Sequence, residues 1–446
     1  MLFRSLFVFI YFVFIKIRHR LDTADLIAIW LVAVPFLGPY TAVEVGGGIP
    51  AINFNRLFVV LLFFSAFSSR EGPPVRLTNG LDYALLFFVG ASLCSVVASF
   101  MIRTPLRLFL DAILTPTIFY FVAKKCVRHS DFLPKLLVAC CIALFLLGGL
   151  GAYEGLSGRD VLHWEGEETH SADTEDFRVN GPMGTAENYG TVMVMLLLFL
   201  LILRGWQYAE LVRRRYLRAA VLVGVIAVAY TLTRGIWLSL IAGWLTFCVR
   251  RRPFFSLTMA GFAVVVWLVL QQAILPQIFG DFWQNRMSQK KTLYARIATY
   301  KSALAMFEDH PILGVGFGTY SEMWERFPGK YFFQHNDEDS VGTPHNLFLA
   351  ILAEMGLLGA IAFLALQIQV FAKALYLAHI ARHELETLYA EAIIATAVAF
   401  LVVGLGLNFT YDTGFVSKLY FLFLGVLSGM VDQAPLKQDS TTLEMP

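Results

Sequence analysis

The sequence predicts an all-α polytopic membrane protein, in which about 12 transmembrane helices are joined by mostly short connections. Of the 446 residues, 57% are hydrophobic and only 15% are charged, whereas a soluble domain carries about 25% charged residues. The mean hydropathy is +0.64. Apolar runs of ~18 or more residues recur along the chain, and each can cross a ~30 Å hydrocarbon core as a helix. Because backbone groups in lipid must be satisfied within the segment, these runs are helices rather than open strands.

The expected spans divide the chain into four parts. Residues 1–275 form an N-terminal transmembrane bundle of about nine spans, residues 276–345 a loop domain, residues 346–432 the C-terminal transmembrane helices, and residues 433–446 a cytoplasmic tail. The apolar run Met1–Ile17 is either an interfacial helix or an extra span, since it lacks the features of a signal peptide. The predicted spans are Ala24–Val43, Phe54–Phe67, Leu81–Met101, Leu106–Ala123, Pro134–Tyr153, Glu187–Leu203, Leu217–Thr231, Gly235–Val249, Phe254–Ala273, Asn346–Ala372, Leu388–Leu407 and Phe415–Met430.

Basic residues orient these spans. If the N-terminus is cytoplasmic, the short inner connections hold most of the lysines and arginines, including Arg213-Arg214-Arg215 and Arg250-Arg251-Arg252. By the positive-inside rule, both ends of the chain are then cytoplasmic and the long loop lies outside. Within that loop, Thr292–Glu308 is predicted to be an amphipathic helix with Ile297, Tyr300, Leu304 and Phe307 at helical spacing, ended by Asp309-His310-Pro311.

Several classes of function are disfavoured. No basic run is interleaved with aromatic residues, so a nucleic-acid partner is not expected. The five cysteines lie within or beside apolar spans without metal-ligand spacing. Neither an HExxH nor a GxSxG motif is present. We therefore predict no metal and no cofactor.

Three outward-facing arginines are candidate phosphate ligands. Arg178 lies just before a span, Arg234 lies in a tight hairpin between two spans, and Arg296 lies on the predicted loop helix. An arginine at the outer interface can grip a phosphate with two hydrogen bonds, or it can simply snorkel to the headgroups. The phosphate role is favoured most for Arg234, because a charge in so short a hairpin costs energy without a partner.

His345 is the candidate general base. It lies where the loop re-enters the membrane, at a helix N-terminus whose dipole favours a neutral imidazole. The alternative is a cap-region histidine without a chemical role. His335 gives a weaker form of the same signal. The glycine-rich turn Gly314–Gly318 can be a phosphate cradle or only a tight turn, and the turn is favoured because the ending of a P-loop is missing. Glu354, a carboxylate inside a predicted span, is either functional or makes a packing hydrogen bond.

The motifs together resemble those of the O-antigen ligase and polymerase superfamily of bacterial inner-membrane glycosyltransferases. The resemblance runs from Arg178 to Gly359 at motif level and over the whole chain in topology. It rests on Arg178…Asn188, Thr231-Leu232-Thr233-Arg234-Gly235, Arg296…Asp309-His310-Pro311-Ile312-Leu313-Gly314-Val315-Gly316, His345-Asn346-Leu347-Phe348-Leu349 and Ala353-Glu354-Met355-Gly356-Leu357-Leu358-Gly359.

The resemblance implies glycan transfer at the periplasmic face of the inner membrane, with a large periplasmic loop that contains amphipathic helices. The donor is a glycan on undecaprenyl diphosphate, and the acceptor is a hydroxyl of lipid A–core in a ligase or of another lipid-linked glycan in a polymerase. It makes Arg234 and Arg296 ligands of the diphosphate, Arg178 a third contact and His345 the general base of a metal-independent, inverting reaction. We expect an O-antigen ligase. The alternatives are a polymerase, a glycan ligase that acts on protein and, from another class, a transporter or flippase for a polar lipid.

Overall fold

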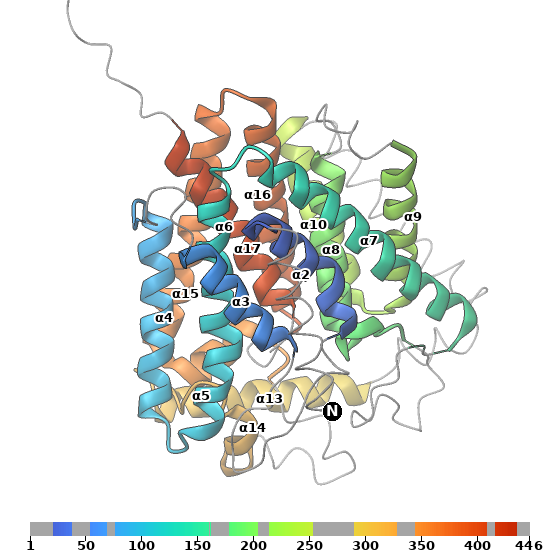
Figure 1. Ribbon diagram of the computed structural model, residues 1–446. Helices are drawn as coiled ribbons and strands as arrows, with labels where there is room; N and C mark the ends of the chain where they lie inside the picture. Colours follow the sequence, from blue (N-terminus) through green and yellow to red (C-terminus); the bar gives the residue numbers. More distant parts are fainter. Residues whose placement is uncertain are drawn as a thin grey trace, which may run out of the picture.

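The computed structural model describes residues 21–37, 54–68, 76–159, 161, 178–203, 214–252, 290–327, 344–407 and 415–434, and every regular element in those ranges is helical (Figure 1). The α-helices are α2 (Thr23–Leu37), α3 (Phe54–Ser68), α4 (Gly80–Ala98), α5 (Arg103–Phe109), α6 (Thr115–Cys126), α7 (Phe132–Ser157), α8 (Ala186–Leu203), α9 (Arg214–Tyr230), α10 (Arg234–Arg251), α13 (Lys290–Asp309), α14 (Tyr320–Met323), α15 (Leu347–Ile380), α16 (Glu384–Gly404) and α17 (Val416–Gln433). A π-helical turn, η2 (Leu110–Leu114), joins α5 to α6, and short 3-10 turns are η3 (Gly181–Met183) and η6 (Trp324–Arg326).

The predicted spans are helical over most of their described residues, and α4, α9 and α16 end before the predicted limits Met101, Thr231 and Leu407, at Ala98, Tyr230 and Gly404. α15 continues beyond its predicted end at Ala372, to Ile380. The predicted span Phe254–Ala273 and the run Met1–Ile17 lie outside the described residues. Six of the described helical segments are long and apolar enough to cross a membrane: α4, the continuous stretch Arg103–Cys126, α7, α8, α15 and α16. The predicted number of about 12 spans stays a prediction.

Helices α8 and α17 form the centre of the bundle. Nearly every side chain of both is buried. Their aromatic rings meet directly, because Phe199 and Phe423 stack with ring centroids 4.5 Å apart. The Tyr389 hydroxyl of α16 donates to the Phe423 carbonyl at 3.0 Å. An all-round apolar surface suits these two helices because other helices surround them.

Close contacts fix the directions of the helices around α16. Arg250 of α10 pairs with Glu391 of α16 at 2.6 Å, and Gly243 lies against Ala395 and Ala399. Helices α10 and α16 are therefore antiparallel. The Asn346 amide donates to the Leu405 carbonyl at 3.1 Å, so α15 begins where α16 ends.

Helix α8 shares the direction of α10. Gly190 lies against Ile236, and about two turns later along both helices Leu198 lies against Gly243. Hence α8, α10 and α15 all begin at one end of the bundle. Helix α13 crosses this end and packs on α15 (Figure 1). We call it the α13 end.

Clusters of basic residues lie at the end of the bundle opposite α13, which is the cytoplasmic end of the predicted topology. They are Lys124, Lys125, Arg128, Lys135, Arg214, Arg215, Arg218, Arg250, Arg251, Arg252, Lys373 and Arg382.

Helix α13 forms where the sequence predicts it and ends at the predicted stop, Asp309. The face that packs is another one. Buried side chains are the small residues Ala298, Thr299, Ser302 and Ala303 together with Met306, whereas Ile297 and Leu304 are 39% and 45% exposed. Small side chains let α13 approach α15 closely. The large apolar side chains are left on the outer face, as suits a helix lying in a membrane interface.

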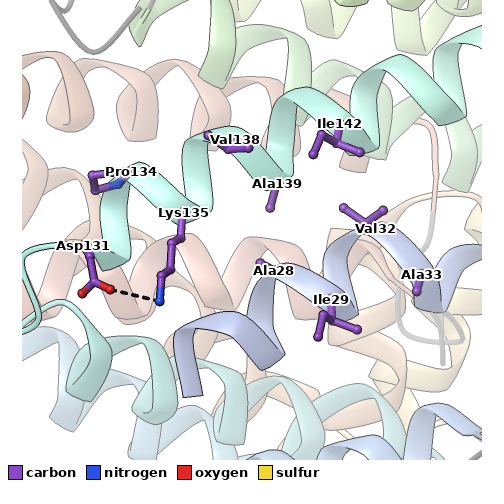
Figure 2. Close-up of a pocket in the computed structure, with 10 residues that line it drawn as sticks. All are labelled: Ala28, Ile29, Val32, Ala33, Asp131, Pro134, Lys135, Val138, Ala139 and Ile142. Atoms are coloured by element: carbon purple, nitrogen blue, oxygen red, sulfur yellow. Dashed lines mark ion pairs between the residues drawn. The ribbon is translucent and has the colours of Figure 1, made fainter. Parts of the chain in front are cut away.

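A groove of about 610 Å³ lies between α2 and α7, distant from the features above (Figure 2). Its walls are apolar except at its mouth, where Lys135 reaches Asp22 and Asp25 at 2.8 Å and Asp131 at 3.0 Å. None of the four predicted site residues lines this groove.

Candidate functional site

Helix α15 is broken near its start, and the glycine-rich turn fills the break. Gly356 has φ 61° and ψ −159°, which interrupts the helical backbone. The Val315 and Gly316 N–H groups donate to the Ala353 and Glu354 carbonyls at 2.9 and 3.0 Å. Beyond the break, the Leu357 and Leu358 N–H groups donate to the Pro311 and Ile312 carbonyls at 2.8 and 3.1 Å. The loop thus satisfies backbone groups that a broken helix leaves without partners.

The glycines of this turn are required by space as well as by conformation. Gly314, Gly316 and Gly318 all have positive φ. A Cβ on Gly314 would lie 2.2 Å from the Glu354 carbonyl carbon, and a Cβ on Gly356 would lie 2.5 Å from the Ile312 carbonyl carbon. The predicted turn is confirmed. The phosphate-cradle alternative is not supported, because the N–H groups of residues 314 to 316 bond within the protein.

Glu354 of α15 also bonds to the segment that follows the glycine-rich turn. Its side chain is fully buried. Its Oε1 accepts the Tyr320 N–H at 3.2 Å, and its carbonyl also accepts the Ser95 hydroxyl of α4 at 2.6 Å. The packing hydrogen bond considered for Glu354 is therefore present.

His345 directly precedes α15 in a strained backbone conformation. Asn346 is the N-cap, and its side chain accepts the Phe348 and Leu349 N–H groups at 3.0 and 3.1 Å. His345 has φ 40°, a left-handed conformation that is uncommon for residues other than glycine. It is half-buried. Strain of this kind is concentrated at functional sites.

Arg234 is the first residue of α10 and its side chain is exposed. The turn before it contains Leu232, whose φ is 49°. Among the described residues other than glycine, Leu232 and His345 have a positive φ. Trp237 braces the turn, because its indole N–H donates to the Val228 carbonyl at 3.0 Å. An arginine at a helix N-terminus combines a guanidinium with the positive end of the helix dipole.

Arg178 lies beside this turn. The N–H of the next residue, Val179, donates to the Tyr230 carbonyl at 3.2 Å. The Arg178 guanidinium lies 3.9 Å from the Glu187 carboxylate in the first turn of α8. This carboxylate partly neutralises the charge of Arg178, which weakens Arg178 as an anion ligand.

Arg296 is exposed on α13. Its carbonyl accepts the Thr299 hydroxyl at 2.9 Å. Two turns further along the same helix, Ala303 and Met306 pack with Ala353 and Leu349 of α15, the helix that follows His345.

The four predicted residues therefore lie at the same end of the bundle. Arg178 and Arg234 belong to its α8–α10 part, and Arg296 and His345 to its α13–α15 part. Together they offer three guanidinium groups for an anion and one imidazole for a proton. Among the residues that the structure describes, no group of three or more His, Cys, Asp or Glu side chains could hold a metal ion. His335 lies outside the described ranges.

Residues 219–364 match a family model described as O-antigen ligase. The chain carries an O-antigen ligase domain. The match, over about a third of the chain, supports the predicted membership of the O-antigen ligase and polymerase family. The domain contains Arg234, Arg296 and His345, whereas Arg178 precedes it. No curated protein matches the chain.

Sequence reasoning missed the residues that assemble this domain. Ser95 and Tyr320 donate from their hydroxyls to backbone carbonyls of other elements, and a single hydroxyl of this kind has no distinctive sequence pattern. The one available signal was Gly356, a glycine directly beyond a buried carboxylate in an otherwise helical run.

Proposed function

We propose that the protein is an O-antigen ligase of the bacterial inner membrane, which transfers a glycan from undecaprenyl diphosphate to a hydroxyl of lipid A–core at the periplasmic face. The observation that carries this proposal is the common location of Arg234, Arg296 and His345. All three lie inside the matched domain and at the α13 end of the bundle, opposite the arginine clusters of α9 and α10 and so at the outer end by the positive-inside rule.

In the proposed mechanism, the arginines hold the diphosphate. As the bond between the anomeric carbon and the phosphate oxygen breaks, negative charge develops on that oxygen, and fixed guanidinium groups stabilise it. Arg234 and Arg296 serve this role and Arg178 is a third, weaker contact. The diphosphate is a good leaving group that needs no protonation, so the reaction needs neither ATP nor a metal.

His345 accepts the proton of the acceptor hydroxyl. The hydroxyl oxygen forms a bond to the anomeric carbon on the face opposite the departing diphosphate, which inverts the configuration. The proton passes to the imidazole, whose ordinary pKa lies near neutrality. Undecaprenyl diphosphate leaves with the electron pair of the broken bond.

The test is transfer by purified protein from a lipid-linked glycan to lipid A–core. His345→Ala and Arg234→Ala should each lower the rate by at least about 100-fold, the scale of a lost general base or charge-stabilising group. His310→Ala and Arg326→Ala are matched controls, since both side chains are exposed near the same end. Full transfer by His345→Ala would overturn the mechanism.

A deletion strain distinguishes the acceptor. Loss of a ligase leaves complete polymer on the carrier lipid, whereas loss of a polymerase leaves single repeat units on it. Accumulation of single repeat units would replace ligase by polymerase with the same site chemistry. Movement of the lipid-linked glycan by reconstituted protein without bond formation would instead revive the flippase alternative.

A further inference from the structure

A continuous chain of hydrogen bonds joins Arg296 to α15. The Arg296 carbonyl accepts the Thr299 hydroxyl at 2.9 Å. The Thr299 carbonyl accepts the Tyr320 phenol at 2.8 Å, and the Tyr320 N–H donates to the Glu354 carboxylate at 3.2 Å. Three separate segments, α13, α14 and α15, are linked in this way, and the side chains of Thr299, Tyr320 and Glu354 are all buried.

Glu354 also anchors this chain to the bundle. Its carbonyl accepts both the Ser95 hydroxyl of α4 at 2.6 Å and the Gly316 N–H at 3.0 Å. Glu354 therefore connects α13 to two long helices of the bundle, α4 and α15.

We propose that Glu354 and Tyr320 are positioning residues for the transfer reaction: their hydrogen bonds fix α13, and with it Arg296, relative to His345 at the start of α15. This inference rests on the proposed function. Neither side chain touches substrate. Both act through the distance between a charge-stabilising group and a base that lie on different helices.

Packing brings α13 close to α15 but does not by itself set the position of α13 along its axis. The buried α13 side chains are the small residues Ala298, Thr299, Ser302 and Ala303 together with Met306, and small side chains interlock less than large ones. A hydrogen bond has a narrow range of length and angle. The hydrogen bonds from Thr299 through Tyr320 to Glu354 therefore fix where α13 lies along its axis.

The chemistry of Glu354 agrees with a positioning role. A buried carboxylate in a helix of a membrane bundle is costly, and an apolar side chain would fill the same space without that cost. Burial, together with the Glu354 charge, raises the pKa of the Tyr320 phenol. The phenol thus stays protonated and remains a donor to Thr299.

Three variants test the proposal in the full-length protein. Glu354→Leu removes the acceptor for the Tyr320 N–H, and Tyr320→Phe removes only the hydroxyl that bonds to Thr299. In each, kcat should fall about 10- to 100-fold, because small misplacements of catalytic groups have effects of this size, while KM for the acceptor changes little. Glu354→Gln keeps an oxygen acceptor and should retain a rate within a few-fold of the parent. Glu391→Gln is the matched control, since Glu391 is a buried carboxylate paired with Arg250 at the opposite end.

A structural readout separates positioning from general destabilisation. Amide hydrogen exchange of residues 296–309 should become faster in Glu354→Leu and Tyr320→Phe and stay unchanged in Glu391→Gln. In an Arg296→Ala background, Tyr320→Phe should lower the rate by less than about two-fold, because coupled residues are not additive. If Glu354→Leu fails to fold, Tyr320→Phe still decides the question.

The outcomes distinguish this inference from the proposed function. If Arg296→Ala abolishes transfer while Tyr320→Phe and Glu354→Leu leave rate and exchange unchanged, the positioning role is wrong and the function stands. If Arg296→Ala transfers at the parent rate, the role of Arg296 itself fails, whatever the exchange of α13 shows.

Discussion

The backbone of Gly314 lies against the backbone of Glu354 so closely that a Cβ on Gly314 would be 2.2 Å from the Glu354 carbonyl carbon. This contact seats the glycine-rich turn in the break of α15. It is a contact of backbone with backbone, so no change of side-chain conformation can relieve a clash there.

Gly314→Ala should therefore dislodge the turn. The new methyl group meets backbone atoms, and the φ of 71° at this position is unfavourable for alanine. We expect a loss of more than about 2 kcal/mol in the free energy of unfolding, the scale of overpacking combined with backbone strain, and loss of transfer. Thermal unfolding in detergent measures the first effect. Gly90→Ala on α4 is the control, because no atom lies within 4 Å of the added Cβ, and an equal loss there would contradict the explanation.

The helices could be predicted from the sequence, and this contact could not. The helices could be located because an apolar run long enough to span a membrane is recognisable from composition alone. Asp309 and Pro311 marked the end of α13 because proline cannot continue a helix. The break at Gly356 was not predicted, since Leu347–Ile380 has the composition of one unbroken apolar helix and the backbone groups freed by the break are satisfied by a separate segment, Pro311–Gly316.

The predicted site was accessible to sequence reasoning to a similar extent. Charged and titratable residues in the outer connections of an apolar chain are conspicuous, and Arg178, Arg234, Arg296 and His345 do lie at one end of the bundle. The packing face of α13 was not accessible. Ile297 and Leu304 have the expected spacing, yet the close approach to α15 selects small residues such as Ala298 and Ala303 instead.

A buried ionic network at the end opposite α13 should be a major source of stability. Lys124 pairs with Asp82 and, at 2.9 Å, with Asp432, and both Lys124 and Asp82 are almost completely buried. Asp82→Ala should cost about 3–5 kcal/mol, the usual result of removing one partner from a buried ion pair. Transfer per folded molecule should be unchanged, because the network is remote from the α13 end. Asp25→Ala at the partly exposed Lys135 cluster should cost about 1 kcal/mol or less, and equal effects of the two variants on the thermal midpoint would show that burial is not the cause.

Chelation should leave transfer unchanged. In the proposed mechanism, guanidinium groups stabilise the departing diphosphate, a task that bound magnesium performs in many phosphate enzymes. Purified protein treated with EDTA should therefore turn over at its original rate, and added magnesium should not increase that rate. A rate that falls on chelation and returns with a divalent cation would assign the charge stabilisation to a metal.

His345→Gly should separate stability from activity. The residue has φ 40°, which costs an L-residue about 1–2 kcal/mol and costs glycine little. The glycine variant should thus be at least as stable as the parent, because relief of this strain offsets the glycine's larger loss of chain entropy on folding. It should nevertheless be inactive, since the imidazole that accepts the proton is gone. His345→Ala removes the same imidazole and keeps the strain, so it should unfold at a lower temperature than His345→Gly while being equally inactive. Equal stability of the two variants would show that the backbone conformation carries no cost, and transfer by either would show that the base is another group.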